Sequence, residues 1–200
     1  MLQTFFSTPL SAETAMLLAT WLWYLLVLIW LLMAFTTKKA KRTETPVERL
    51  LHLVPLLISF WLLFGRNHPL PWLYFPLLPA LFILWWTGLL LTALGIAISI
   101  WARLSLGADW SGTVTLKNNH ELIRAGLYNR IRHPIYTGIL IAFVGTGLIH
   151  SQVRDLLGFL LLYATFHFKA RREESFLFHE FGPSFTEHRD RTGMFWPKLS

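Results

Sequence analysis

Two separated groups of polar residues carry the side chains most able to do chemistry in this chain. The first, Gly126–Gly138, holds arginines, two tyrosines and a proline at the start of an apolar run, Ile135–Ile149. The second, Glu173-Glu174, follows another apolar run, Leu156–Phe168. Charged groups beside hydrocarbon are costly unless they pair or hold a ligand. We therefore expect a charged ligand between Arg132 and the two glutamates.

The tripeptide Arg132-His133-Pro134 predicts a helix start that favours anions. Proline suits the first helical position, and the residue before it is biased away from helix. The free N–H groups of a helix N-terminus attract negative charge, and a guanidinium binds carboxylate or phosphate in a bidentate manner. The alternative interpretation, equally open on this tripeptide alone, is contact with lipid head groups.

The adjacent acids Glu173 and Glu174 are candidates for the opposite wall of the same pocket. Neighbouring helical residues point about 100° apart, so only one of them is expected to face a ligand. That carboxylate is suited to pair with Arg132 or to accept hydrogen bonds from an amine or hydroxyl. The alternative interpretation is a solvated helix end in which Arg171 and Arg172 are local partners.

Other polar and aromatic residues are weaker candidates. Trp110 and Tyr128 are suited to stack on a base or to contact a sulfonium, although aromatic residues near an interface are more often anchors. His120 lacks a second ligand at metal-binding spacing, so no metal site is expected.

The absence of cysteine excludes disulfides, cysteine–zinc sites and thiolate nucleophiles. Four further histidines are predicted to be interfacial or, like the basic tail, solvated: His150, His167, His179 and His188.

The composition is that of a membrane protein. Of 200 residues 54% are hydrophobic and only 14% are charged, and Met16–Phe35 is uncharged over roughly 30 Å of helix, the thickness of a bilayer core. The 18 Lys and Arg residues alternate between connecting segments as 0, 5, 1, 5, 1 and 6. By the positive-inside rule this pattern explains the net charge of +7 without nucleic acid and predicts an outside N-terminus, five membrane helices and a cytoplasmic C-terminus.

These elements predict an all-α integral membrane protein with two regions. Residues 1–102 hold three membrane helices, at Met16–Phe35, at about Leu50–Phe64, and a third that ends at about Trp101. Pro76 and Pro79 are predicted to lie near the start of the third helix, in its first turn. The region 103–200 holds a cytoplasmic loop and then the two shorter apolar runs, which are expected to form a helical hairpin. The cofactor pocket is expected to be built from the 103–134 loop and the C-terminal helix.

Within the predicted hairpin, small residues and a stop signal have distinct roles. Gly138, Ala142 and Gly145 share one helical face, a pattern that allows two membrane helices to approach closely. The second helix is expected to continue to Glu180, until Gly182-Pro183 ends it. This continuation carries the two glutamates out to the level of Arg132. The segment Thr113–Ile123 suggests a small hairpin or an irregular loop.

The order of these motifs over about Leu104–Phe195 resembles the isoprenylcysteine carboxyl methyltransferase family and the related phospholipid N-methyltransferases. The resemblance is carried by Leu106-Gly-Ala-Asp-Trp-Ser111, His120-Glu-Leu-Ile-Arg-Ala-Gly126, Tyr128, Arg132-His-Pro-Ile-Tyr136, Glu173-Glu174 and Phe181-Gly182. The first hundred residues match only as hydrophobic spans. Where the family often has tyrosines three and six residues past the last glycine, this chain has Phe185 and His188, so a hydroxyl role there is lost.

The resemblance implies a multi-pass methyltransferase that binds S-adenosylmethionine on its cytoplasmic side and takes a lipophilic substrate from the bilayer. The expected location is the bacterial inner membrane. It implies catalytic roles for Arg132, Glu173 and Glu174, which also belong to the cofactor-binding set. The complete implied set is His120, Gly126, Tyr128, Arg132, His133, Tyr136, Glu173 and Glu174.

Several functions remain open at this stage. An ionised carboxylate acceptor needs no general base, whereas an amine acceptor needs deprotonation. Membrane lipids and a lipophilic or lipidated acceptor are the expected partners, and nucleic acid is not. The alternatives are a relative of NADPH-dependent sterol-type membrane reductases and a non-enzymatic membrane interaction protein.

Overall fold

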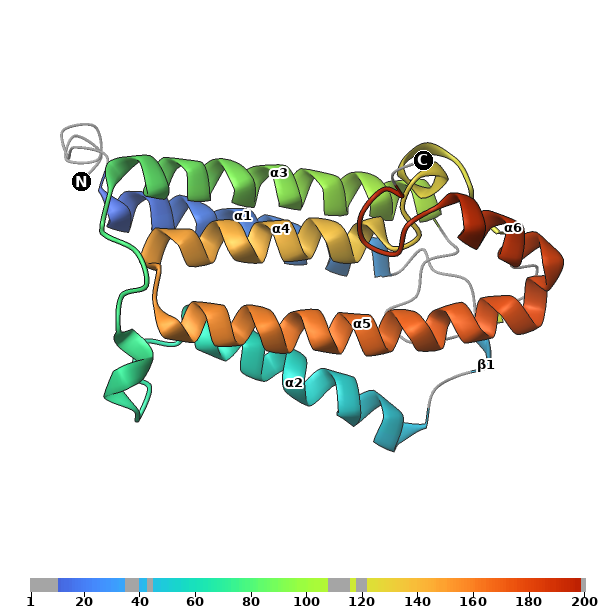
Figure 1. The fold of residues 1–200 in the computed structure, drawn as a ribbon, viewed down its shortest axis with the longest axis horizontal. Coiled ribbons are helices and arrows are strands. Elements are labelled where there is room, and N and C mark those ends of the chain that lie inside the picture. The colour runs from blue at the N-terminus through green and yellow to red at the C-terminus, as the bar shows by residue number, and fades with distance from the viewer. Residues whose placement is uncertain (1–10, 35–39, 43–44, 108–115, 118–121, 199–200) are drawn as a thin grey trace.

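A computed structural model describes residues 11–34, 40–42, 45–107, 116–117 and 122–198. Long helices run back and forth along one direction and place the ends of distant segments together (Figure 1). In chain order the elements are α1 (Ala12–Ala34), β1 (Ala40–Arg42), α2 (Pro46–Phe64), the 3-10 helix η1 (Pro71–Tyr74), α3 (Phe82–Leu106), β2 (Leu116–Lys117), the 3-10 helix η3 (Gly126–Asn129), α4 (Pro134–His150), α5 (Val153–Phe181) and α6 (Pro183–Arg191).

Three of these helices are long and apolar enough to cross a membrane. They are Ala12–Ala34, Val47–Phe64 within α2, and Phe82–Leu106. The apolar helix α4 has only 17 residues, and α5 combines an apolar first half with a charged second half. Large apolar side chains are exposed along α1, α2 and α3, as expected where lipid is the solvent. A fully five-span topology stays a prediction.

Helices α3 and α4 pack closely because glycines face one another across their contact. A Cβ added to Gly88 of α3 would lie 2.5 Å from the carbonyl oxygen of Gly145 on α4. The predicted small-residue face of α4 is therefore confirmed, and its partner is α3. Buried hydrogen bonds add to this packing, since Trp23 Nε1 donates to Thr146 Oγ1 at 2.9 Å and the hydroxyls of Thr92 and Thr146 lie 3.1 Å apart.

Helix α2 begins at Pro46, a few residues before the predicted membrane span of about Leu50–Phe64, because Thr45 caps it. The pattern of Pro46 and Glu48 indicates this helix start in the sequence. The Thr45 hydroxyl accepts from the Glu48 N–H and the Glu48 carboxylate accepts from the Thr45 N–H, at 3.3 and 2.9 Å. Glu48 also pairs with Arg172 of α5 at 2.7 Å. This contact corrects the interpretation of Arg172 as a local partner of the neighbouring glutamates.

The prediction that Pro76 and Pro79 lie in the first turn of the third helix is wrong, since α3 begins at Phe82. Their segment is extended and pairs with the turn between α4 and α5. The Leu77 N–H donates to the Ser151 carbonyl at 2.6 Å, and the Val153 N–H donates to the Phe75 carbonyl at 3.1 Å. These bonds hold the chain outside the helix.

Helices α4 and α5 are separated by Ser151 and Gln152 alone and run side by side in opposite directions (Figure 1). Pro134 is the first residue of α4, as predicted. Helix α5 continues to Phe181, where Gly182 at φ 49° ends it and Pro183 begins α6. The all-α prediction missed one short pairing: β2 joins β1 of the first connecting segment in an antiparallel ladder. The remainder of the segment Thr113–Ile123, which was predicted to be a small hairpin or an irregular loop, lies largely outside the described residues.

Candidate functional site

The predicted cation and acids meet at the end of the bundle where α4 begins. Arg132 Nε lies 2.7 Å from Glu174 Oε1. Both groups are almost buried, with side-chain exposures of 10% and 7%. The start of α4 positions the arginine, and the charged second half of α5 positions the glutamate. These two atoms are in direct hydrogen-bond contact, so a charged ligand held by Arg132 and the glutamates stays a prediction and would lie beside this pair.

His133 bridges the two glutamates. Its Nε2 lies 3.2 Å from Glu174 Oε1, and its Nδ1 lies 3.4 Å from Glu173 Oε2. Because both ring nitrogens face carboxylate oxygens, both are placed to donate, which is the pattern of an imidazolium. Burial would lower the pKa of His133, but the hydrogen bonds and charges of Glu173 and Glu174 outweigh it, so the pKa is raised.

The two glutamates occupy different places, which answers a question that helical spacing left open. Glu174 lines a cavity, whereas Glu173 accepts a 2.7 Å hydrogen bond from the Tyr136 hydroxyl and faces His133 Nδ1. Burial would raise the pKa of each glutamate, but hydrogen bonds from His133 outweigh it for both. Lys169 also lowers the pKa of Glu173, and Arg132 lowers that of Glu174. Both carboxylates are therefore ionised at neutral pH.

The cavity beside this charged pair has a volume of about 370 Å³, within the range of small-molecule sites. Its lining comes from α5, from Arg132, and from α6 with the segment that follows it. The lining residues are Arg132, Tyr163, His167, Arg171, Glu174, Arg189, Met194, Phe195 and Trp196. Of the described part of the 103–134 loop, only Arg132 lines it. Residues 108–115 and 118–121 of this loop lie outside the described residues, so its part in the pocket stays a prediction.

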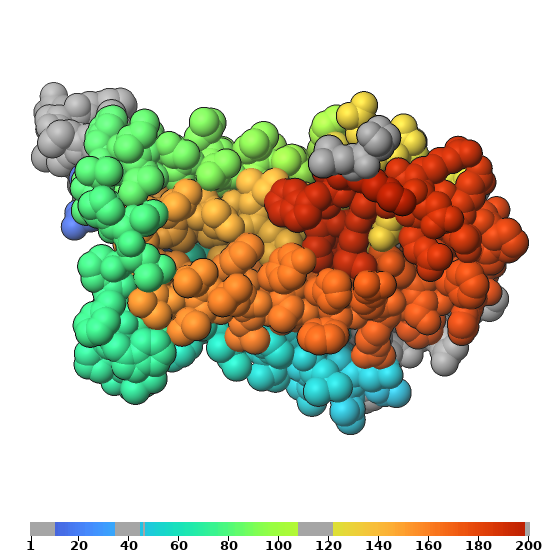
Figure 2. Space-filling model, in the orientation of Figure 1, coloured from blue at the N-terminus to red at the C-terminus, as the bar shows by residue number. Residues whose placement is uncertain are grey.

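The segment Thr192–Trp196, here called the C-terminal segment, supplies part of the lining because its backbone pairs with the chain before α4. The N–H groups of Arg132 and His133 donate to the carbonyls of Gly193 and Met194 at 2.9 and 3.0 Å. The Arg132 Nη1 atom also donates to the Thr192 carbonyl. Figure 2 shows the C-terminal end of the chain, in red, lying across α4 and α5.

The prediction that the basic tail is solvated is wrong for its apolar residues. Phe195 is 3% exposed and its ring contacts those of His133, Tyr136, Tyr163 and His167. His188 is likewise buried, at 7% exposure. The available signal was the apolar sequence Gly193-Met-Phe-Trp196 inside a basic tail, since aromatic residues there gain by covering an apolar surface.

Two other predicted site residues lie away from the cavity lining. Gly126 adopts φ 60° at the start of η3, a conformation that favours glycine. Tyr128 is buried beside α3, where its hydroxyl donates to the Ala102 carbonyl at 3.4 Å. Burial raises the pKa of this phenol, so it stays protonated. His120 and Trp110 lie outside the described residues.

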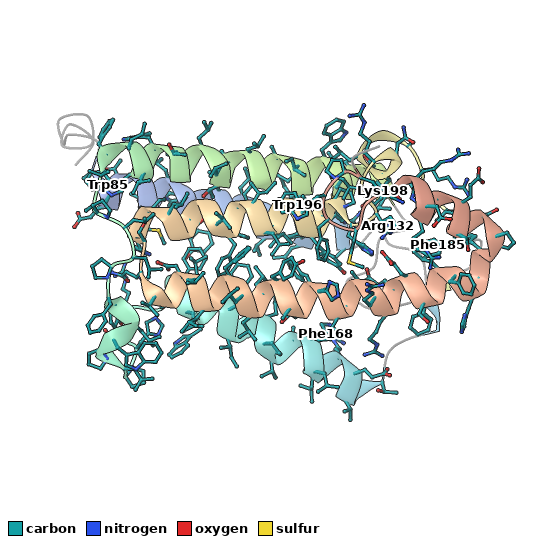
Figure 3. The ribbon with its side chains drawn as sticks, viewed as in Figure 1. Trp85, Arg132, Phe168, Phe185, Trp196 and Lys198 are labelled. Atoms are coloured by element: carbon teal, nitrogen blue, oxygen red, sulfur yellow. The ribbon has the colours of Figure 1, made fainter. Side chains whose placement is uncertain are left out.

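The arrangement is suited to hold a zwitterion. Within the described chain, Arg132 Nη2 and Glu174 Oε2 make no hydrogen bond, although their neighbouring atoms do. Both residues line the cavity, so a free guanidinium N–H and a free carboxylate oxygen are available side by side for a ligand. Arg132 and Trp196 lie on the side of α5 that faces α4, and Phe168 lies on the opposite side (Figure 3). Among the described residues no three metal-ligating side chains come together.

Fold and site together define a helical membrane protein with a charged cavity at one end of its bundle. A family model described as phospholipid methyltransferase matches residues 83–184. The chain belongs to this family. That membership and the relatives described below confirm the resemblance predicted from the motifs.

Individual relatives add detail. The protein-S-isoprenylcysteine O-methyltransferase of Dictyostelium discoideum is 27% identical over 135 residues, which cover 66% of this chain and 53% of that protein. The cobalt-zinc-cadmium resistance protein CzcN of Cupriavidus metallidurans is 33% identical over 122 residues, which cover 58% of this chain and 53% of that protein. In both cases the match spans about half the relative's length.

A solved structure shares the fold. The eukaryotic intramembrane Ras methyltransferase, an isoprenylcysteine carboxyl methyltransferase, matches with a TM-score of 0.50 and 22% identity over 77% of this chain and 53% of that one.

Proposed function

We propose that this protein transfers a methyl group from S-adenosylmethionine to a lipophilic acceptor held in the membrane. The observation that carries the proposal is the cavity flanked by a free guanidinium donor of Arg132 and a free carboxylate oxygen of Glu174. The methionine part of S-adenosylmethionine carries one carboxylate and one ammonium group, which match these two side chains in charge. Family membership supports the same class of reaction.

When bound, S-adenosylmethionine supplies a methyl group on a sulfonium, which is activated toward nucleophilic displacement. The protein's own contribution is binding, orientation and exclusion of water. Arg132 would hold the α-carboxylate and Glu174 the α-ammonium group of the cofactor's methionine part. His133, Glu173 and Tyr136 position them, because His133 donates to both glutamates and Tyr136 donates to Glu173. Phe195 adds an apolar surface to the lining of the cavity.

The acceptor is proposed to be an isoprenylcysteine-like carboxylate or a lipid amine. A carboxylate acceptor is ionised near neutral pH and needs no proton removal. An amine acceptor loses a proton on transfer and requires a base. The relatives named as isoprenylcysteine O-methyltransferases support the carboxylate.

The proposal is tested by calorimetric binding of S-adenosylhomocysteine and of NADPH to the detergent-solubilised protein. Arg132→Lys keeps a cation beside Glu174 but removes the planar second donor, and should weaken binding about tenfold or more. Arg130→Lys is the matched control, because Arg130 is exposed and does not line the cavity. Glu174→Gln should also weaken binding about tenfold, whereas Glu173→Gln should have a smaller effect.

Transfer itself is tested by incubating the protein with S-adenosylmethionine labelled on the methyl group and a total membrane-lipid extract. Label in a lipophilic product identifies the acceptor. Binding of NADPH in place of S-adenosylhomocysteine would favour a reductase, and binding of neither would favour an interaction protein.

A further inference from the structure

The cavity extends beyond the charged pair along one face of α5. Four of its lining residues, Tyr163, His167, Arg171 and Glu174, follow one another at steps of four, four and three, which places them on one helical face. Tyr163 and His167 fall within the apolar run Leu156–Phe168, at the predicted level of the bilayer. The cavity therefore leads from that level to the charged end.

Two polar side chains along this path have no polar partner in the described chain. His167 makes only ring contacts, with Tyr163, Phe168 and Phe195 at centroid distances of 6.1–6.4 Å. Arg171 forms no hydrogen bond or ion pair with a described residue, whereas Arg172 is held by Glu48 and Arg189 lies near Asp190. His167 is half-buried within the apolar run, where a polar group is costly unless a ligand satisfies it, whereas Arg171 is exposed just beyond the run.

The charges of the lining leave this pair without a counter-ion. Among the described lining residues Glu174 is the one acid, and it is already shared by Arg132 and His133. Arg171, one turn beyond His167, is thus an exposed cation at the cavity wall with no counter-ion among the described residues. An anionic group is the ligand that both an arginine and an imidazole N–H are suited to bind.

We infer that His167 and Arg171 form a subsite for an anionic head group of the acceptor and select it over an uncharged one. This inference rests on the proposed function, because it assigns the other half of the same cavity. The lipophilic part of the acceptor then lies toward Tyr163 and the apolar half of α5. His167 and Arg171 act here as specificity-determining residues.

The test measures binding of N-acetyl-S-farnesylcysteine, which has a free carboxylate, and of its uncharged methyl ester. Both are titrated by calorimetry into the full chain in detergent, with and without saturating S-adenosylhomocysteine. The wild type should bind the acid about tenfold or more tightly than the ester. His167→Ala and Arg171→Ala should each reduce this preference severalfold without changing the affinity for the ester.

Two further variants separate a direct role from a structural one. His167→Gln keeps an N–H donor and should retain most of the preference, and His179→Ala, at an exposed position of the same helix, should retain all of it. Equal binding of acid and ester by the wild type, or an unchanged preference in both alanine variants, would overturn the inference. Selective binding of the acid by a protein that does not bind S-adenosylhomocysteine would keep the subsite and refute the proposed function.

Discussion

At the scale of single residues, the site is a charge-balanced group of two cations and two acids. Arg132 and His133 come from the start of α4, and Glu173 and Glu174 from the second half of α5. Adjacent charges of one sign are tolerated in each element because the opposite element supplies their partners. Removing one member of such a buried group leaves an uncompensated charge, which typically costs about 3–5 kcal/mol. Arg132→Ala is therefore a poor probe of ligand binding.

This group predicts a defined pH dependence of stability. The pKa of His133 is raised in the folded state. Its contribution to folding stability is therefore fully present below the ordinary pKa of 6.5 and is lost as pH rises through the folded-state pKa. The pKa values of the two glutamates are lowered in the folded state. Their contribution to folding stability is therefore fully present above the ordinary pKa of 4.5 and is lost as pH falls through the folded-state values. Stability from this group should be greatest between these two ordinary values.

The measurement is the thermal unfolding midpoint in detergent as a function of pH. His133→Gln should remove the alkaline decline, and His179→Gln, at an exposed position, should keep it. An alkaline decline of the same size in His133→Gln would show that another group titrates.

At the scale of elements, the contact between α3 and α4 extends along α4 from Gly138 to Gly145 and fixes the position of this helix. Gly88→Ala should destabilise the protein by about 1–3 kcal/mol, because the new Cβ would lie 2.5 Å from the Gly145 carbonyl oxygen. Ala97→Val, at an exposed position of α3, is the control and should have little effect. Unfolding of both variants by denaturant measures the difference. Equal stabilities would mean that the two helices separate at small cost.

The C-terminal segment is the second element on which the site depends. Phe195→Ala should destabilise the protein by about 3–5 kcal/mol, since it opens a cavity among His133, Tyr136 and Tyr163. Trp196→Ala should cost much less in stability, because Trp196 is 55% exposed. Thermal unfolding of the two variants makes the comparison. A larger loss for Trp196→Ala would contradict the assigned packing.

At the scale of the whole molecule, the ends of α1 and α3, the starts of α2 and α4, and α6 all lie toward the end of the bundle that holds the site (Figure 1). In the sequence, most of the Lys and Arg residues lie in the segments next to these ends. Reporter tags placed after Ser200 and within Arg66–His68 should therefore report opposite faces of the membrane. Accessibility labelling in intact cells measures this directly. A shared face would refute the predicted orientation.

Much of the fold was predictable because helix-forming signals act locally. Pro134 begins α4 and Gly182-Pro183 ends α5, as their backbone preferences require. The apolar runs located the membrane helices to within a few residues. The positions of Pro76 and Pro79 were not predictable, because hydrogen bonds to the distant α4–α5 turn decide their conformation.

The amino-acid sequence alone determined the chemical character of the site: which residues carry charge, that they flank two apolar helices, and which family they resemble. Only the tertiary structure decided that Glu174 rather than Glu173 faces the cavity, and that Thr192–Trp196 forms one of its walls. The physical reason is range. A helix start or stop depends on neighbours along the chain, whereas the partner of a buried charge or of an unpaired backbone N–H depends on which distant segment packs against it.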